Sequence, residues 1–200
     1  MNNESLGEIL GFYLLQKGFN RFSSFCKNGK IRLLNLLDRD WSDWMTIDWK
    51  KEVELRKEDL LKDLFTLLRI DSVRDDSKAT EDAPVGPGPK EALEAFLAIG
   101  ERDGFTTKQV GNLAGHIEFA PNPDYKETLG VLGHVDVVPV GTGWDTNPFE
   151  PQIINNRIYA RGSSDDKGPS MAAYYALKII KELGLPVSKR VRFIIGTDEE

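Results

Sequence analysis

The chain has 200 residues, 40% of them hydrophobic, which is enough for one domain of ordinary size with a buried core. Its formal net charge is −6 and it has no run of lysines or arginines, which argues against nucleic acid as its main partner. A single cysteine, Cys26, excludes an intramolecular disulfide and favours a reducing compartment.

The first 44 residues differ from the rest of the chain. They hold six Lys and Arg against five Asp and Glu, a charge of +1, so the other 156 residues carry −7. Their apolar stretch at residues 9–15 is short and follows acidic rather than basic residues, unlike a signal peptide or a membrane span. A weaker alternative is an interfacial helix over residues 6–25. We therefore expect a cytoplasmic protein with no membrane partner. We interpret residues 1–44 as an amino-terminal extension whose place in the working protein stays open.

From residue 45 onward, helical and extended patterns alternate. Apolar positions at helical spacing predict three helices, over residues 49–70, 90–103 and 170–183. Apolar or alternating runs predict strands over residues 105–111, 113–119, 129–139 and 191–196, and a hairpin whose arms are residues 152–154 and 157–160. Residues 71–89, rich in charge, glycine and proline, predict a long loop. This order favours an α/β fold with a mostly parallel central sheet flanked by helices.

Three polar clusters fall at predicted strand ends or loops. They are His134 with Asp136, Asp165 with Asp166, and Glu199 with Glu200. Taken singly, each has an ordinary explanation, namely a structural hydrogen bond, a turn or a solvated run of charge. The other histidine, His116, fits a half-buried strand residue with a satisfied hydrogen bond.

Together the clusters suggest a metal site, because an imidazole and converging carboxylates are the ligand set of zinc or a similar divalent ion. Asp136 can accept the second ring N–H of His134, and Asp165 or Asp166 can bridge two ions about 3.5–4 Å apart. One of the two glutamates can face a metal while the other faces a water. Since zinc lowers the pKa of bound water to about 7, a nearby carboxylate can take its proton, and such a site would hydrolyse an amide or similar acyl bond.

The sequence also resembles a known family. Residues 133–139 (GHVDVVP), 159–169 (YARGSSDDKGP) and 196–200 (GTDEE) are similar to three successive signatures of the dinuclear zinc peptidases that include aminoacylase and glutamate carboxypeptidases. Residues 46–49, 86–89, 143–144 and 147–149 resemble in particular the bacterial PepV-type dipeptidases, also called Xaa-His or carnosinase-like dipeptidases. The resemblance covers about residues 45–200.

The resemblance implies a role for each matching position in a site that holds two zinc ions and cleaves a small dipeptide. His134 would bind one zinc, Asp165 would bridge both, and Glu200 would bind the other. Glu199 would be the general base and Asp136 would orient His134. The family has a cis peptide bond after the bridging residue, before Asp166.

The sequence departs from the family after Glu200, where it stops. The family completes its site with a further aspartate and a late histidine, and its PepV-type members add a lid domain. We therefore expect residues 45–200 to be the amino-terminal part of a catalytic domain, and the chain alone to be an inactive fragment. A deacylase of N-acyl amino acids and a non-catalytic remnant stay open as alternatives, as does the oligomeric state.

Overall fold

A computed structural model describes residues 46–200, so the predicted extension over residues 1–44 lies outside the described residues. The elements in chain order are α3 (Trp49–Leu55), α4 (Lys57–Leu68), a 3-10 turn η1 (Asp76–Lys78), α5 (Pro87–Arg102), β1 (Thr106–Val110), β2 (Ala114–Phe119), β3 (Thr128–His134), β4 (Gln152–Ile154), β5 (Arg157–Tyr159), α6 (Lys167–Glu182) and β6 (Arg190–Gly196). Among these residues, no helix is both long and apolar enough to cross a membrane.

The central sheet has the strand order β1-β2-β6-β3, and β4 pairs with β5 in a separate hairpin. The α/β class is confirmed, but the expected mostly parallel pairing is wrong for this part of the chain. The β1–β2 and β2–β6 pairs are antiparallel, and the β3–β6 pair is parallel. The reason is the length of the connections. Only a short turn at residues 111–113 joins β1 to β2, whereas α6 provides the long crossover that a parallel pair requires.

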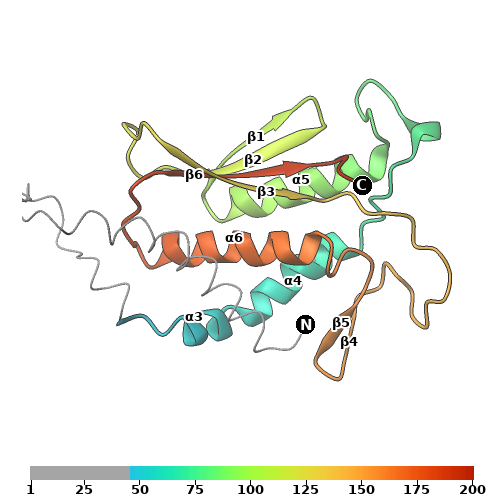
Figure 1. Cartoon of the computed structure of the whole chain (residues 1–200), viewed down its shortest axis with the longest axis horizontal. Coiled ribbons are helices and arrows are strands. Elements are labelled where there is room, and N and C mark those ends of the chain that lie inside the picture. Colours follow the sequence, from blue (N-terminus) through green and yellow to red (C-terminus); the bar gives the residue numbers. More distant parts are fainter. Residues whose placement is uncertain (1–45) are drawn as a thin grey trace, which may run out of the picture.

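Helices α5 and α6 pack on the same face of this sheet (Figure 1). Gly115 and Gly133 both pair with Ile195, so all three positions face the same side. A Cβ placed on Gly115 would meet Leu97 of α5, and one placed on Gly133 would meet Ser170 of α6. On the opposite face Leu132 is 80% exposed, so within residues 46–200 helices cover one face of the sheet.

Aromatic side chains fill the space between the helices and the sheet. Phe96 of α5 makes edge-to-face contacts with Tyr174 of α6 and Phe193 of β6, at centroid distances of 5.7 and 5.6 Å. Each such pair adds about 0.5–1.5 kcal/mol beyond the burial of its surface. These contacts fix α5 and α6 relative to the strands whose ends carry the predicted site.

An ion-pair network joins the three longer helices. Arg102 at the end of α5 forms a two-pronged pair with Asp63 of α4, with N–O distances of 2.7 and 2.8 Å. It also binds Asp103, which accepts hydrogen bonds from Tyr174 and Lys178 of α6 at 2.7 and 2.9 Å. Burial alone would raise the pKa of Asp103, but its hydrogen bonds from Arg102, Lys178 and Tyr174 outweigh that effect and lower the pKa to about 2.

Three predicted helix boundaries need correction. The helix expected over residues 49–70 is two helices, α3 and α4, separated at Arg56. The guanidinium of Arg56 forms ion pairs with Glu52 and Glu182. Helix α5 begins at Pro87 rather than at Lys90. Proline is compatible with the first turn of a helix, because the N–H that it lacks would have no partner within the helix at that position. Helix α6 begins at Lys167, three residues before the predicted start.

Candidate metal centre

The predicted site residues come from three separate parts of the fold. His134 is the last residue of β3 and pairs with Gly196, the last residue of β6. Because β3 and β6 are parallel, their carboxyl ends meet at one edge of the sheet, where Glu199 and Glu200 follow β6. Asp165 lies in the turn that leads into α6.

Three of these side chains converge closely enough to hold a metal ion. One ligand atom each from His134, Asp165 and Glu200 lie within 4.8 Å of one another. The Nε2 atom of His134 is 3.3 Å from Asp165 Oδ1 and 3.8 Å from Glu199 Oε2. The imidazole is buried, whereas the carboxylates of Asp165 and Glu200 are exposed and open to a substrate or ion. The structure therefore brings together the residues that the sequence predicted as ligands.

Asp136 lies beneath this cluster and is only 2% exposed. The Nδ1 atom of His134 is 3.2 Å from the Asp136 carbonyl oxygen and 3.4 Å from its Oδ1. Within the described residues, Oδ1 is a buried atom without a hydrogen-bond partner. A neutral His134 that donates from Nδ1 toward Asp136 leaves the Nε2 lone pair facing the carboxylates, which is the arrangement of a metal-binding imidazole.

Asp136 also contacts the glutamates, which the sequence did not reveal. Its Oδ2 accepts hydrogen bonds from the backbone N–H groups of Glu199 and Glu200, at 2.8 and 3.1 Å. One buried carboxylate thus joins the end of β3 to the segment after β6. No spacing signal could show this bond, because the bonded residues are 63 and 64 positions apart.

The electrostatic surroundings of His134 favour a positive charge. Burial alone would lower the pKa of His134, but the charges of Asp136 and Asp166 outweigh burial and raise the pKa above its ordinary value. The same excess of negative charge around Nε2 would attract a divalent cation. The donor set, one imidazole with carboxylates, fits zinc.

The turn before α6 is held tightly against β3. The Asp165–Asp166 peptide bond is cis, as the resemblance implies. Asp166 Oδ2 accepts from the His134 N–H at 3.2 Å and from the Ser170 hydroxyl at 2.7 Å. A Cβ added to Gly133 would lie 2.2 Å from Ser170 Oγ, so only glycine allows α6 to approach β3 this closely.

The segment that carries the glutamates has two further supports. Thr197 donates from its N–H and its hydroxyl to the Leu113 carbonyl, at 3.1 and 2.8 Å. Arg74 binds both oxygens of Asp198, at 2.7 and 2.9 Å. Sequence reasoning missed Arg74, which lies in the predicted surface loop 124 positions before its partner.

Two buried polar residues next to the site were also missed. The Ser72 hydroxyl donates to the Val135 carbonyl at 2.6 Å, and the Ser72 backbone carbonyl accepts from the Val137 N–H at 3.2 Å, so Ser72 fixes the backbone around Asp136. Lys167 is fully buried, and burial lowers its pKa to about 8. A serine or lysine in a polar stretch normally predicts exposure, so neither gave a signal.

His116 lies on β2, opposite Ile194 of β6, and is partly buried, as predicted for a strand histidine. It belongs to no group of three possible metal ligands among the described residues.

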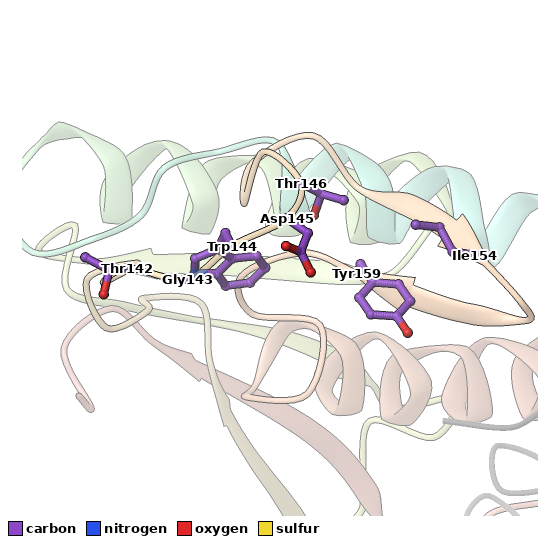
Figure 2. A pocket seen from close by; sticks show the side chains of 7 residues that line it. All are labelled: Thr142, Gly143, Trp144, Asp145, Thr146, Ile154 and Tyr159. Carbon is purple, nitrogen blue, oxygen red and sulfur yellow. The ribbon is translucent and has the colours of Figure 1, made fainter.

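A cavity of about 420 Å³ lies between the loop after β3 and the β4–β5 hairpin (Figure 2). It is lined by Thr142, Gly143, Trp144, Asp145, Thr146, Ile154 and Tyr159. The Trp144 indole donates to the Val140 carbonyl at 2.7 Å, which fixes one wall of the cavity. None of the three converging ligands lines it, so the cavity is distinct from the candidate metal centre.

Residues 130–200 match the model of Peptidase family M20/M25/M40. Residues 130–200 are therefore similar to M20 peptidases. The matched residues include every predicted ligand at the sheet edge, and the resemblance inferred from the three motifs is confirmed.

Curated relatives agree with this assignment. The chain is 54% identical over 152 residues to a Staphylococcus aureus (strain USA300) protein named "Putative dipeptidase SAUSA300_1697". It is 55% identical over the same length to a "Putative dipeptidase" of Staphylococcus epidermidis. Each match covers 76% of this chain and 32% of the relative, so the chain spans about a third of the length of these relatives. This coverage fits the predicted amino-terminal fragment.

Solved structures support the fold. Human carnosine dipeptidase 1 matches with a TM-score of 0.60 at 21% identity, over 74% of this chain and 34% of that one. The M20 family metallo-carboxypeptidase Sso-CP2 of Sulfolobus solfataricus matches with a TM-score of 0.56 at 28% identity, over 69% of this chain and 30% of that one. The arrangement of helices on the sheet is therefore similar to that of these solved structures.

Proposed function

We propose that this chain is the amino-terminal part of a zinc-dependent dipeptidase. The observation that carries the proposal is the convergence of His134, Asp165 and Glu200 within 4.8 Å at the shared edge of β3 and β6. The dipeptidase names of the curated relatives support a small peptide as the substrate. The family match supports hydrolysis as the reaction.

Each residue of the site has a distinct part in this proposal. Zinc bound here would polarise the peptide carbonyl and acidify the attacking water. His134 holds its Nε2 toward the ion because its Nδ1 is directed at Asp136. Asp165 lies between the imidazole and open solvent, where its carboxylate could bridge two ions. Glu199, whose side chain is 66% exposed and 3.8 Å from His134 Nε2, accepts the proton of the water as general base.

The proposal assigns this chain three of the family's protein ligands. The resemblance implies a further aspartate and a late histidine, and the chain spans about a third of the length of its relatives. We propose that the 200-residue chain alone binds zinc weakly and turns over negligibly.

A deacylase of N-acyl amino acids is the second candidate, because the ligands on the sheet edge are the same for either substrate. The relatives' names favour the dipeptidase. Assays of the protein purified from its native cells on dipeptides and on N-acetyl amino acids separate the two. Activity confined to the acylated compounds would overturn the dipeptidase proposal.

Zinc binding by the chain tests the site itself. Because the chain alone binds zinc weakly, the competitor is a chromophoric chelator of low zinc affinity; we expect the wild-type chain to compete with it, and His134→Ala and Asp165→Ala each to weaken binding at least about tenfold. Asp59→Ala, at an exposed position of α4, is the matched control and should bind as wild type does. Unchanged zinc affinity in both site variants would refute the metal centre.

A further inference from the structure

Lys167 is buried, and among residues 46–200 no acidic side chain makes a hydrogen bond to it. It is the first residue of α6 and follows the cis Asp165–Asp166 bond, yet its exposed fraction is 0%. Its ammonium donates to the carbonyl oxygens of Leu67 and Ile70, at 3.0 and 2.9 Å. Burying a charged group costs several kcal/mol unless its hydrogen bonds are made, so these two bonds are what keeps the lysine inside.

Leu67 lies in the last turn of α4, which ends at Leu68, and Ile70 lies two residues beyond that end. The carboxyl end of a helix carries a partial negative charge. An ammonium at this point therefore interacts favourably with the helix dipole as well as with the two carbonyls. Lys167 therefore joins the start of α6 to the end of α4, about 100 positions earlier in the chain.

The aliphatic part of Lys167 is enclosed by the turn that carries Asp165. A Cβ on Gly162 would lie 3.1 Å from Lys167 Cδ and 3.0 Å from Val137 Cγ1, so the stem runs in contact with this turn and beside the segment after β3. The turn closes through a hydrogen bond from the Gly168 N–H to the Gly162 carbonyl, at 3.2 Å. The ends of the turn thus lie against a side chain whose head is anchored in α4.

We infer that Lys167 is a positioning residue for the proposed metal centre, because it fixes the turn carrying Asp165 to the carboxyl end of α4. This inference rests on the proposed function. Lys167 is fully buried and its donors face backbone carbonyls, so it acts through the turn and not on a substrate. Without the anchor, the turn loses its fixed distance from β3 and Asp165 loses its place opposite His134.

The test compares Lys167→Met with wild type in the full 200-residue chain, measured by chelator competition with Zn²⁺ alone. Methionine keeps most of the stem but removes the donors. We expect about tenfold or greater loss of zinc affinity at a temperature where circular dichroism shows the variant folded, as is typical when groups behind a metal ligand are removed. Lys62→Met, at an exposed position of α4, is the control and should bind zinc as wild type does.

A merely structural lysine would give a different result. It would lower the midpoint of thermal unfolding of the metal-free chain but leave the zinc affinity of the folded variant unchanged, and that outcome overturns the inference. If Lys167→Met does not fold, Lys167→Gln, whose shorter amide can still donate, replaces it. Its affinity should fall between wild type and His134→Ala, and wild-type affinity would again overturn the inference.

The failure of this inference is distinguishable from failure of the proposed function. If His134→Ala binds zinc as tightly as wild type, the metal centre itself is wrong. If His134→Ala loses zinc while folded Lys167 variants keep it, only the positioning role falls.

Discussion

Asp136 gives the sharpest test of how the site is built, because its two oxygens face different partners. Oδ2 accepts from the N–H groups of Glu199 and Glu200, and Oδ1 lies 3.4 Å from His134 Nδ1. Asp136→Ala removes both functions. Asp136→Asn keeps one oxygen for the backbone N–H groups and places an NH2 group beside His134.

The two variants should therefore differ in stability. Hydrogen bonds to a charged group contribute about 1.5–3 kcal/mol each, so Asp136→Ala loses roughly 3–6 kcal/mol of such bonds. Removing a buried carboxylate also removes its desolvation cost, which offsets part of the loss, and we expect a net destabilisation of about 2 kcal/mol. Asp136→Asn should lose less, because its amide oxygen still accepts from both N–H groups.

Both variants should bind zinc poorly. With an amide NH2 facing Nδ1, His134 is driven to the tautomer whose proton is on Nε2, and that nitrogen can no longer bind a metal. We expect a loss of about 10–100-fold in zinc affinity for Asp136→Asn, with near-normal urea unfolding of the metal-free chain. Chelator competition and urea unfolding measured on the same samples provide the assay.

One result would refute this reasoning. If Asp136→Asn binds zinc as tightly as wild type, then Nδ1 donates to the Asp136 carbonyl oxygen, 3.2 Å away, and the side chain does not select the tautomer.

Two further predictions concern the frame of the site. Gly133→Ala should destabilise the chain by about 2 kcal/mol or more, because the new Cβ would lie 2.2 Å from Ser170 Oγ. Gly130→Ala, on the same strand with open space around it, is the control and should change thermal stability little. Equal effects of the two substitutions would contradict the packing argument. Asp103 has a pKa lowered to about 2, below its unfolded value of about 3.9, so its stabilising contribution is present above pH 4 and is lost as the pH falls toward 2. After allowance for screening by solvent, we expect Asp103 to contribute roughly 1–2 kcal/mol to the free energy of unfolding. Urea unfolding of wild type and Asp103→Asn at pH 5 and pH 2.5 measures this contribution. The same pH dependence in both proteins would exclude the effect.

The convergence of the site could be predicted from sequence because it depends on local patterns. Apolar runs over residues 129–139 and 191–196 predict two strands, and the parallel pairing of those strands places their carboxyl ends together. The turn that carries Asp165 precedes a clearly amphipathic helix, so its position at the same edge also follows from the order of elements.

The remaining features depend on contacts that no local pattern encodes. Strand β2 pairs with β6 in antiparallel orientation, although the two strands are far apart in the sequence. The pattern of apolar residues within either strand does not specify which strand becomes its neighbour. Lys167 and Ser72 are polar residues whose burial becomes clear only when the end of α4 and the segment after β3 are placed beside them. The sequence therefore predicted the three converging side chains and Asp136, but not the supports from Ser72 and Lys167.

The most direct test of the metal centre is a crystal structure of the chain soaked with Zn²⁺, with anomalous diffraction recorded at the zinc edge. We expect anomalous density between these side chains, with one zinc about 2.0–2.2 Å from His134 Nε2 and an Asp165 oxygen, and a second zinc bound by Asp165 and Glu200. A zinc peak elsewhere, with no density between these three side chains, would contradict it.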